Sequence, residues 1–485
     1  MIHISWYNIM YYYMKGKIQL MENFSFWDPA VWGTFNLIAV LLGSLLGADV
    51  LKKVIPALKK SLIPSSVLGG LILLVISVCY ESISGEIFFN IEFFGGNGSG
   101  ILEILTYHCL ALGFIATTLK PSDEKFGKKR TWEIFNTGVT TVSTYLLQGI
   151  LGISITIIAA MISEKIFPAA GVLLPFGFGQ GTGQALNYGN IYEMEFGFVG
   201  GRSFGLTIAA IGFLSASFGG VIHLNILKKK GVNYDWDRSD RDAESLNIND
   251  VQGPNEIPMN GTIDKLTMQL VFIGLAYLIA YFAMSGLGTL LSSFKSVLFG
   301  FNFLLGVLAA TLIKVINNLL MKKGIVKRQH ISGFLMTRLS GFFFDFMIVA
   351  GVAAIRINVL KDYWLVIIIL SIVGAVTTFV YNHFIAKTLF PEYIEEQFMV
   401  MYGMLTGTAS TGIVLLREID PDLKTPASEN LVYQSFPAMV FGFPLMLFAT
   451  MAPEKPELVL LIMIGCFIVM NLILFRSLIF KRKKS

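Results

Sequence analysis

Charged residues are scarce in this sequence. They make up 14% of its 485 residues, against about 25% in an ordinary soluble domain. Hydrophobic residues make up 54% and lie in long runs, and a run of about 20 apolar residues spans the hydrocarbon core of a bilayer as a helix. The scarcity of charge therefore excludes a soluble globular protein and predicts an all-α, polytopic membrane protein with the lipid bilayer as a partner.

Cysteine and histidine are also few. The three cysteines, Cys79, Cys109 and Cys466, lie inside apolar runs, which argues against a disulfide framework. The histidines are scattered along the chain, and no two of them stand at the sequence spacing of metal ligands. They are His3, His108, His223, His330 and His383. We therefore expect no cofactor and no catalytic cluster, and hence a protein that is not an enzyme.

Motifs for nucleotides and nucleic acids are missing as well. The glycine run at residues 177–183 is not closed by Lys-Ser or Lys-Thr, so it is not a phosphate-binding loop. The net charge of +5 comes from basic residues clustered at the ends of apolar runs. We expect neither a nucleotide nor a nucleic-acid partner, which leaves an ion gradient as the common source of energy.

Apolar runs bounded by charged residues predict eleven transmembrane helices. Their ranges are 31–51, 62–80, 101–119, 134–161, 197–227, 267–291, 297–320, 331–355, 363–388, 432–452 and 458–480. A polar stretch at residues 228–263 is typical of a cytoplasmic linker between two halves. The predicted organisation is an N-terminal extension (1–30, with Met21 as an alternative start), a first membrane repeat (31–227), the linker (228–263), a second membrane repeat (264–452), and an additional C-terminal helix with a basic tail (453–485).

Two further apolar segments are too rich in glycine and hydroxyl residues to be ordinary helices. They are residues 171–190, GVLLPFGFGQGTGQALNYGN, and residues 401–417, MYGMLTGTASTGIVLLR. Glycine in a helix costs about 1 kcal/mol relative to alanine. Non-helical backbone persists at membrane depth only where it is buried in protein or lines a watery cavity. We therefore expect two re-entrant segments with broken backbone.

The basic clusters give the orientation of these segments, because cytoplasmic loops carry an excess of Lys and Arg. If the eleven helices cross and each glycine segment enters and leaves on one side, every basic cluster falls in the cytoplasm, although Arg356 and Lys361 fall outside. The N-terminus is then outside and the C-terminus in the cytoplasm of a bacterial inner membrane. The two segments enter from opposite sides, which predicts two inverted-topology repeats with a site between them.

Interrupted helices expose backbone groups that bind ligands. Helix N-termini attract anions, while freed carbonyls and hydroxyls coordinate sodium. The candidate substrate- and ion-binding residues of the first segment are Gly177, Gly179, Gln180, Gly181, Thr182, Gly183 and Gln184. Those of the second segment are Gly403, Thr406, Gly407, Thr408, Ser410 and Thr411. The alternative is that these small residues only let helices pack closely, but their occurrence in two matching segments favours binding.

Two charged residues at membrane depth complete the candidates, since such charges are costly and usually functional. Arg202 follows the first segment and either clamps a substrate carboxylate or anchors the mouth of its helix. Asp345 lies in the middle of a predicted span and either binds an ion or pairs with Arg338. The candidate sodium ligands are Thr182, Thr408, Ser410 and Asp345.

The first glycine segment resembles a known motif. Residues 177–185, GFGQGTGQA, resemble the re-entrant motif Gly-Gly-His-Gly-Thr-Gly-Ala-Ala of bacterial sodium/glutamate symporters, with Gln180 where that family often has His. The best matches are Gly179, Gly181, Thr182, Gly183 and Ala185. The second segment is similar but looser. There Gly403, Gly407, Thr411 and Ile413 fit, whereas Leu405 replaces a glycine and Ser410 a proline.

The resemblance covers roughly residues 31–450. It implies a homodimer of inverted five-helix repeats that imports L-glutamate, a small anionic amino acid, with sodium (Na+) as the coupling ion. It also implies a moving transport unit rather than an open pore. The altered second motif and Arg202 leave the cargo open, so the nearer alternative is the same fold carrying another carboxylate or coupled to protons. The alternative from another class is a passive channel.

Overall fold

The computed structural model describes residues 25–121, 127–231, 256–257, 263–292, 295–421 and 423–479. Residues 1–24 of the predicted N-terminal extension and most of the predicted linker lie outside this description. Within the described residues the secondary structure is helical, with no strand. The prediction of an all-α protein is confirmed.

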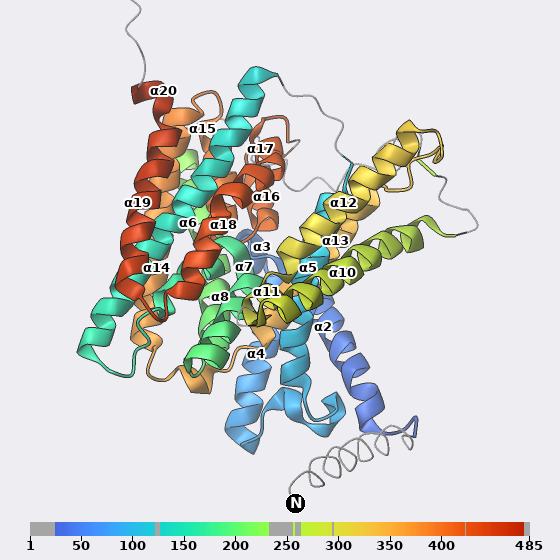
Figure 1. The fold of residues 1–485 in the computed structure, drawn as a ribbon. Coiled ribbons are helices and arrows are strands. Elements are labelled where there is room, and N and C mark those ends of the chain that lie inside the picture. The colour runs from blue at the N-terminus through green and yellow to red at the C-terminus, as the bar shows by residue number, and fades with distance from the viewer. Residues whose placement is uncertain are drawn as a thin grey trace, which may run out of the picture.

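The helices fall into two successive sets (Figure 1). The first set is α2 (Pro29–Val54), α3 (Pro56–Lys60), α4 (Ser65–Ser84), α5 (Gly98–Leu119), α6 (Lys128–Ile162), α7 (Leu173–Phe196) and α8 (Gly201–Lys229). The second set is α10 (Lys265–Leu290), α11 (Lys295–Gly300), α12 (Asn302–Lys322), α13 (Gly333–Ala353), α14 (Trp364–Leu389), α15 (Ile394–Thr406), α16 (Ala409–Arg417), α17 (Ala427–Tyr433) and α18 (Ser435–Met451). They are followed by α19 (Pro456–Leu474) and α20 (Arg476–Ile479).

Ten helices among the described residues are long and apolar enough to cross a membrane, and the bent pair α17–α18 makes an eleventh span if it is counted as one. Each of the eleven predicted spans overlaps one of these. The predicted span 297–320 is divided in the structure, because α11 ends at Gly300 and α12 begins at Asn302. The chain is therefore a multi-pass membrane protein.

Local sequence signals explain several helix ends. Asp28 caps α2 by accepting a hydrogen bond from the backbone N–H of Ala30 at 3.0 Å, and Pro29 occupies the first helical position. Asp264 caps α10 in the same way through two backbone N–H groups. Capping side chains satisfy N–H groups that the first helical turn leaves without partners.

The second set of helices repeats the packing pattern of the first. The contact of α2 with α4 is matched by that of α10 with α12, and the contact of α4 with α13 by that of α12 with α5. Likewise, α8 packs on α14 as α18 packs on α6. Helix α19 packs on α6 and on α18, outside this pattern.

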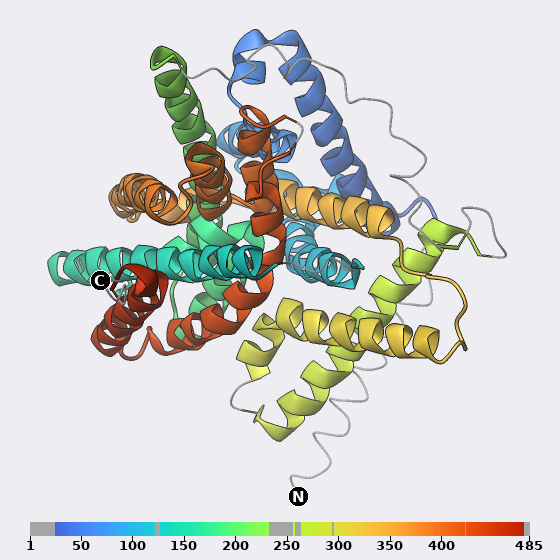
Figure 2. The same ribbon diagram turned by 90° about the horizontal axis from the view of Figure 1, so that it is seen from above.

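Two groups of helices form separate hydrophobic cores. The larger core joins α6, α14, α15, α18 and α19 with most of α7. A second core joins α2, α4, α5 and α13, and α10 and α12 pack on α5 and α13. Seen from above, α10 and α12 lie together on the side away from α14 and α19 (Figure 2). Residues of α8 belong to both main cores, so α8 lies where the two groups of helices meet.

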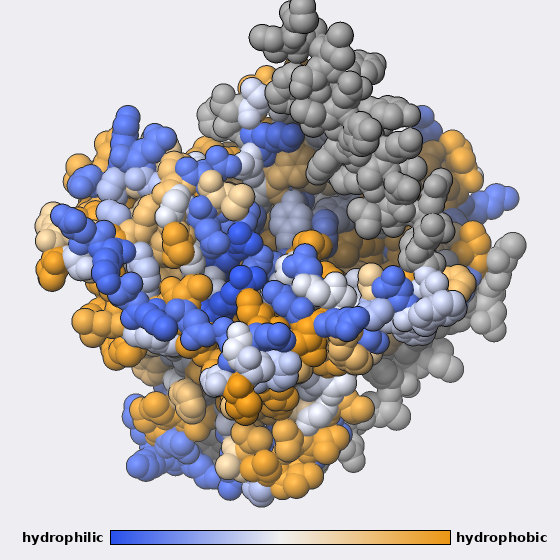
Figure 3. All heavy atoms as spheres, turned by 90° about the horizontal axis from the view of Figure 1, so that it is seen from below, coloured by the Kyte–Doolittle hydropathy of each residue, from blue (hydrophilic) through white to orange (hydrophobic). Residues whose placement is uncertain are grey.

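The outer surface fits a lipid environment. Large hydrophobic side chains are exposed along α10, including Leu270, Leu278 and Phe282, and a soluble monomer rarely exposes contiguous apolar surface of this kind. Figure 3 shows one end of the bundle, where hydrophilic residues gather across the face and hydrophobic surface lies beside them. A polar end beside apolar flanks is a distribution that fits a bilayer.

Candidate functional site

The first glycine segment forms a helical hairpin within α7. The backbone leaves helical geometry at Gly181, where φ is +79° and ψ is −170°, a region that is nearly restricted to glycine. Phe176 and Tyr188, on either side of the break, stack with ring centroids 4.0 Å apart. In a straight helix, residues with this separation would be about 18 Å apart. The chain therefore reverses at Gly181, as expected for a re-entrant segment.

The second glycine segment forms the hairpin α15–α16. Helix α15 ends at Thr406, and α16 begins at Ala409. A Cβ atom added to Gly403 would lie 2.7 Å from the Cα of Gly412, so the two arms touch at a pair of glycines. Thr408 caps α16 by accepting a hydrogen bond from the backbone N–H of Thr411 at 3.5 Å. The predicted interruption in this segment is confirmed.

The tips of the two hairpins meet. A Cβ atom added to Gly181 would lie 3.3 Å from Cγ2 of Thr408. Gly212, in the middle of α8, packs against both hairpins, since an added Cβ would lie 3.0 Å from Cδ1 of Phe178 and would also clash with the carbonyl oxygen of Thr406. The tips of α7 and of α15–α16 are therefore neighbours at the level of Gly212.

The hairpins approach this point from opposite ends of α8. Gly189, in the second arm of α7, packs against Gly201 at the start of α8. Glu395, at the start of α15, contacts His223 near the end of α8. The two interrupted segments therefore enter the bundle from opposite ends of α8.

The first tip is almost fully enclosed. Thr182 is buried, and its hydroxyl donates to the carbonyl of Met347 in α13 at 3.4 Å. Gln184 is 1% exposed, and neither its amide nitrogen nor its amide oxygen has a hydrogen-bond partner among the described residues. Gln180 is partly exposed. Because nearly all buried polar groups in proteins are hydrogen-bonded, the unpartnered amide of Gln184 requires an explanation.

The second tip is more open. Thr406 is buried and donates its hydroxyl to the carbonyl of Tyr402 at 2.7 Å. The hydroxyls of Thr408 and Thr411 lie 3.3 Å apart, and Ser410 is exposed. The predicted hydroxyl residues of this segment therefore surround the first turn of α16.

Helix α6 holds both tips, which the sequence reasoning missed. The hydroxyl of Tyr145 donates to the carbonyl of Gly179 at 2.9 Å, in the first hairpin. One turn further along, the amide of Gln148 donates to the carbonyl of Leu405 at 2.9 Å, in the second. The signal available in the sequence is the run of hydroxyl residues at 137–144 that leads to Gln148 inside an otherwise apolar span.

A buried polar network continues from the second tip toward the end of the bundle where α15 begins. Successive hydrogen bonds join Thr141 to Gln434, Thr137 to Gln397, Gln397 to Asn430, Asn430 to Tyr393 and Tyr393 to Glu133. Burial raises the pKa of Tyr393, which precedes α15, so its hydroxyl keeps its proton and donates to Glu133. Polar groups thus lead from the level of the tips to the end of the bundle.

Arg202 does not lie at the tips. It is the second residue of α8, ten residues before Gly212 and hence about 15 Å along the helix. Its guanidinium forms ion pairs with Glu103 at 2.6 Å and Glu193 at 3.3 Å. With two carboxylates already bound, Arg202 is placed to fasten the start of α8 to α5 and α7.

Asp345 is likewise separate from the tips. Met347 in α13 contacts the first tip near Gly181, whereas Asp345, two residues earlier, is exposed. Two residues of helix correspond to about 200° of rotation, so the two side chains lie on different sides of α13. Arg338 lies over the ring of Phe334, at 5.2 Å from its centroid.

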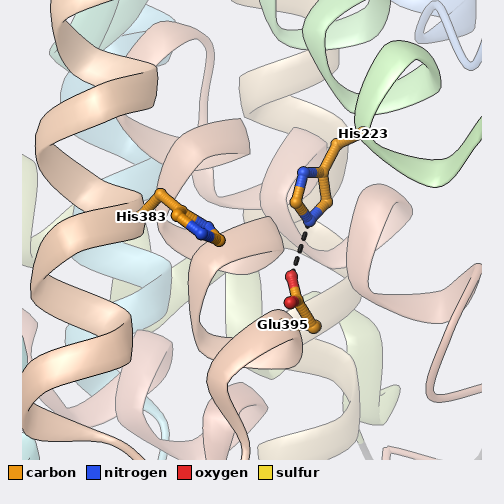
Figure 4. A group of neighbouring side chains, drawn as sticks. All are labelled: His223, His383 and Glu395. Carbon is orange, nitrogen blue, oxygen red and sulfur yellow. Dashed lines mark hydrogen bonds and ion pairs between the residues drawn. The ribbon is translucent and has the colours of Figure 1, made fainter. Parts of the chain in front are cut away.

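Two histidines that stand far apart in the sequence come together in the fold. His223 in α8, His383 in α14 and Glu395 in α15 present ligand atoms that all lie within 4.8 Å of one another (Figure 4). The scattered histidine spacing led to the expectation of no metal-ligand pair. Sequence spacing does not indicate this cluster, because its three residues come together only in the tertiary structure.

No protein-family model matches the chain, and no curated protein matches it. The two hairpins, the polar groups around their tips and the membrane-spanning fold are therefore the features from which a function can be inferred.

Proposed function

We propose that the protein is a secondary active transporter that imports L-glutamate, an acidic amino acid, together with Na+ by alternating access. The observation that carries the proposal is the meeting of two helical hairpins, from opposite ends of the bundle, at Gly181 and Thr408. Paired interrupted helices at the interface of two repeats are how many secondary transporters build a midplane site.

The chemistry of the tips suits an anion and a cation together. Helix α16 begins at the second tip and the second arm of α7 at the first, and the free N–H groups of a helix N-terminus attract a carboxylate. Helix α15 and the first arm of α7 end there, and their last carbonyls are the groups that coordinate sodium. Thr408 and Thr411 add hydroxyl oxygens.

Gln184 supports a ligand at the first tip. Burying an amide without a partner costs about 1–3 kcal/mol in proteins. Gln184 is buried with both amide atoms unpartnered among the described residues. A substrate with an ammonium and a carboxylate group can satisfy both ends of this amide. The ammonium donates a hydrogen bond to the amide oxygen, and the carboxylate accepts one from the amide N–H.

The two hydrophobic cores support a moving transport unit. Most of the first hairpin and part of the second belong to the core of α6, α14, α18 and α19. The other core is formed by α2, α4, α5 and α13, with Ala185 and Leu186 of α7 packed into it. In the proposed mechanism the first group moves against the second and exposes the tips to alternate sides of a bacterial inner membrane. A homodimer, with the N-terminus outside and the C-terminus in the cytoplasm, belongs to the same proposal.

The test is uptake of radiolabelled L-glutamate into proteoliposomes, with and without an inward sodium gradient. We expect accumulation that requires the gradient and that stops when an ionophore collapses it. Protein-free liposomes and the Gly274→Ala variant, whose added Cβ would meet open space, are the controls. Uptake that ignores a collapsed sodium gradient would contradict the proposal.

Three outcomes separate the alternatives. Sodium-dependent uptake of another radiolabelled carboxylate, with no uptake of glutamate, would indicate the same fold with another cargo. Accumulation driven by a pH gradient in the absence of sodium would indicate proton coupling. Current that does not saturate with substrate concentration would indicate a passive channel.

A further inference from the structure

The cluster of His223, His383 and Glu395 lies at the base of the second hairpin. Nε2 of His223 and Oε2 of Glu395 are 2.6 Å apart, and the rings of the two histidines are 5.7 Å apart. Figure 4 shows the three side chains converging from α8, α14 and α15. Glu395 precedes Thr406 by eleven residues, about 17 Å of helix, so this cluster is distinct from the hairpin tips.

One ring nitrogen of the cluster has no hydrogen-bond partner within the described part of the chain. Nδ1 of His383 is buried and has no hydrogen bond among the described residues, whereas His223 is bound to Glu395. A buried imidazole nitrogen with no partner is costly unless something binds it. This observation is independent of the spacing of the three side chains, and it indicates that the cluster is incomplete as it stands.

We infer that His223, His383 and Glu395 bind a divalent transition-metal ion such as Zn2+. Two imidazoles and one carboxylate, with a remaining position for water, are a ligand set that zinc uses in proteins. Imidazole nitrogen also selects transition metals over Na+, which prefers oxygen. The ligand atoms already lie within 4.8 Å of one another, and side-chain rotations bring them to the separation of about 3.4 Å that bonds of about 2.1 Å require.

The surroundings hold the imidazole rings in place. Phe398 packs against His223 with ring centroids 4.5 Å apart and against His383 at 5.2 Å, and Phe379 covers His223 at 5.7 Å. Such a hydrophobic shell limits access of water to a metal centre. Lys230 and Lys387 act electrostatically on His383 and oppose a cation, so Glu395 is the group that offsets them.

A metal ion here would join three helices. Glu395 belongs to the first turn of α15, while His223 and His383 come from α8 and α14. Coordination would therefore fix the base of the second hairpin against its neighbours. Since binding to the folded state alone raises stability, Zn2+ should raise the unfolding temperature of the protein.

The test uses the purified full-length chain, freed of any affinity tag and of metal. We expect Co2+ to give the visible absorption bands of a low-symmetry nitrogen–oxygen site with one equivalent per chain, and Zn2+ to displace it and to raise the Tm. His383→Ala and Glu395→Gln should each weaken binding. Loss of a supporting hydrogen bond alone costs about 10–100-fold in metal affinity, so loss of a ligand should cost at least that much.

The control is His330→Ala, because the hydrogen bond that joins His330 to another of the described residues uses its backbone carbonyl, which accepts from Gln269. This variant should keep full Co2+ and Zn2+ binding. The absence of Co2+ bands and of any Zn2+ effect on Tm would overturn the inference. So would binding that survives in His383→Ala, which would indicate adventitious surface sites. None of these measurements involves uptake, so their failure is distinguishable from failure of the proposed transport.

Discussion

The two hairpins reverse the chain in different ways. The first reverses at Gly181, a single residue with positive φ, and its arms are joined by the stacked rings of Phe176 and Tyr188. The second reverses over Gly407 and Thr408, and its arms touch at Gly403 and Gly412. The first tip is enclosed, whereas the second leaves Ser410 exposed.

The first tip therefore depends on a backbone conformation that favours glycine, whereas the second depends on a side chain that caps the next helix. At the first tip the backbone requires the absence of a Cβ atom, and the amide of Gln184 has no hydrogen-bond partner among the residues that the structure describes. At the second tip Thr408 satisfies an N–H group of the next helix. The first hairpin should therefore tolerate substitution less well than the second, and its polar group should matter more for ligand binding than for stability.

The largest effect is expected from Gly181→Ala. An alanine in this backbone region costs about 1–3 kcal/mol of folding free energy, and its Cβ would approach Cγ2 of Thr408 at 3.3 Å. Uptake should be lost and the Tm lowered. The matched variant Gly274→Ala lies in an open helical position of α10. It should keep uptake, and its free energy of unfolding should rise by up to about 1 kcal/mol. Normal uptake by Gly181→Ala would show that the tip does not need this geometry.

The next effect tests the unpartnered amide. Gln184→Met removes two buried polar atoms that have no hydrogen-bond partner in the described ranges, and it keeps a long unbranched side chain. We expect the free energy of unfolding to rise by about 1–3 kcal/mol while uptake is lost. Both are measured on the same preparation, by chemical unfolding in detergent and by proteoliposome uptake. A fall in stability with uptake preserved would mean that Gln184 serves the fold alone.

The α6 contacts should have a smaller effect. Tyr145→Phe removes the hydrogen bond to the carbonyl of Gly179 in the first hairpin, and Gln148→Leu removes the one to the carbonyl of Leu405 in the second. Each should lower the free energy of unfolding by about 1 kcal/mol and reduce uptake. If unfolding shows no change for either variant, α6 does not hold the tips.

The smallest effect is expected at the cap of α16. Thr408→Ala removes the side-chain acceptor of the Thr411 N–H and should lower the free energy of unfolding by about 1 kcal/mol. Thr408→Ser keeps a capping hydroxyl and should keep most of that stability. Thermal unfolding of the two variants gives the comparison. A stability loss as large as that of Gly181→Ala would remove the distinction between the two tips.

Much of the fold follows from the sequence because a spanning helix needs only length and apolar side chains. The glycine clusters also located both chain reversals. The start of the second hairpin was missed, since α15 begins at Ile394 and the predicted segment at residue 401. Glu395, Glu396 and Gln397 look like a polar loop, yet Gln397 is buried because Thr137 and Asn430 hydrogen-bond to it.

The site was predictable only where its residues are local in the chain. Their content of glycine and hydroxyl residues identifies the segments Gly177–Gln184 and Gly403–Thr411. The roles of Tyr145 and Gln148 depend on which helix lies beside the tips, and the meeting of His223 with His383 depends on the packing of α8 against α14. No periodicity within one segment contains that information, so only the tertiary structure supplies it.

The two contacts of α6 have a mechanical consequence. Tyr145 and Gln148 lie within one turn of the same rigid helix and bind different hairpins. Sliding one tip past the other would break at least one of these hydrogen bonds, whereas displacing α6 carries both tips together. A ligand held between them would travel with an unchanged coordination shell, and what alternates would be the walls around the site rather than the site itself.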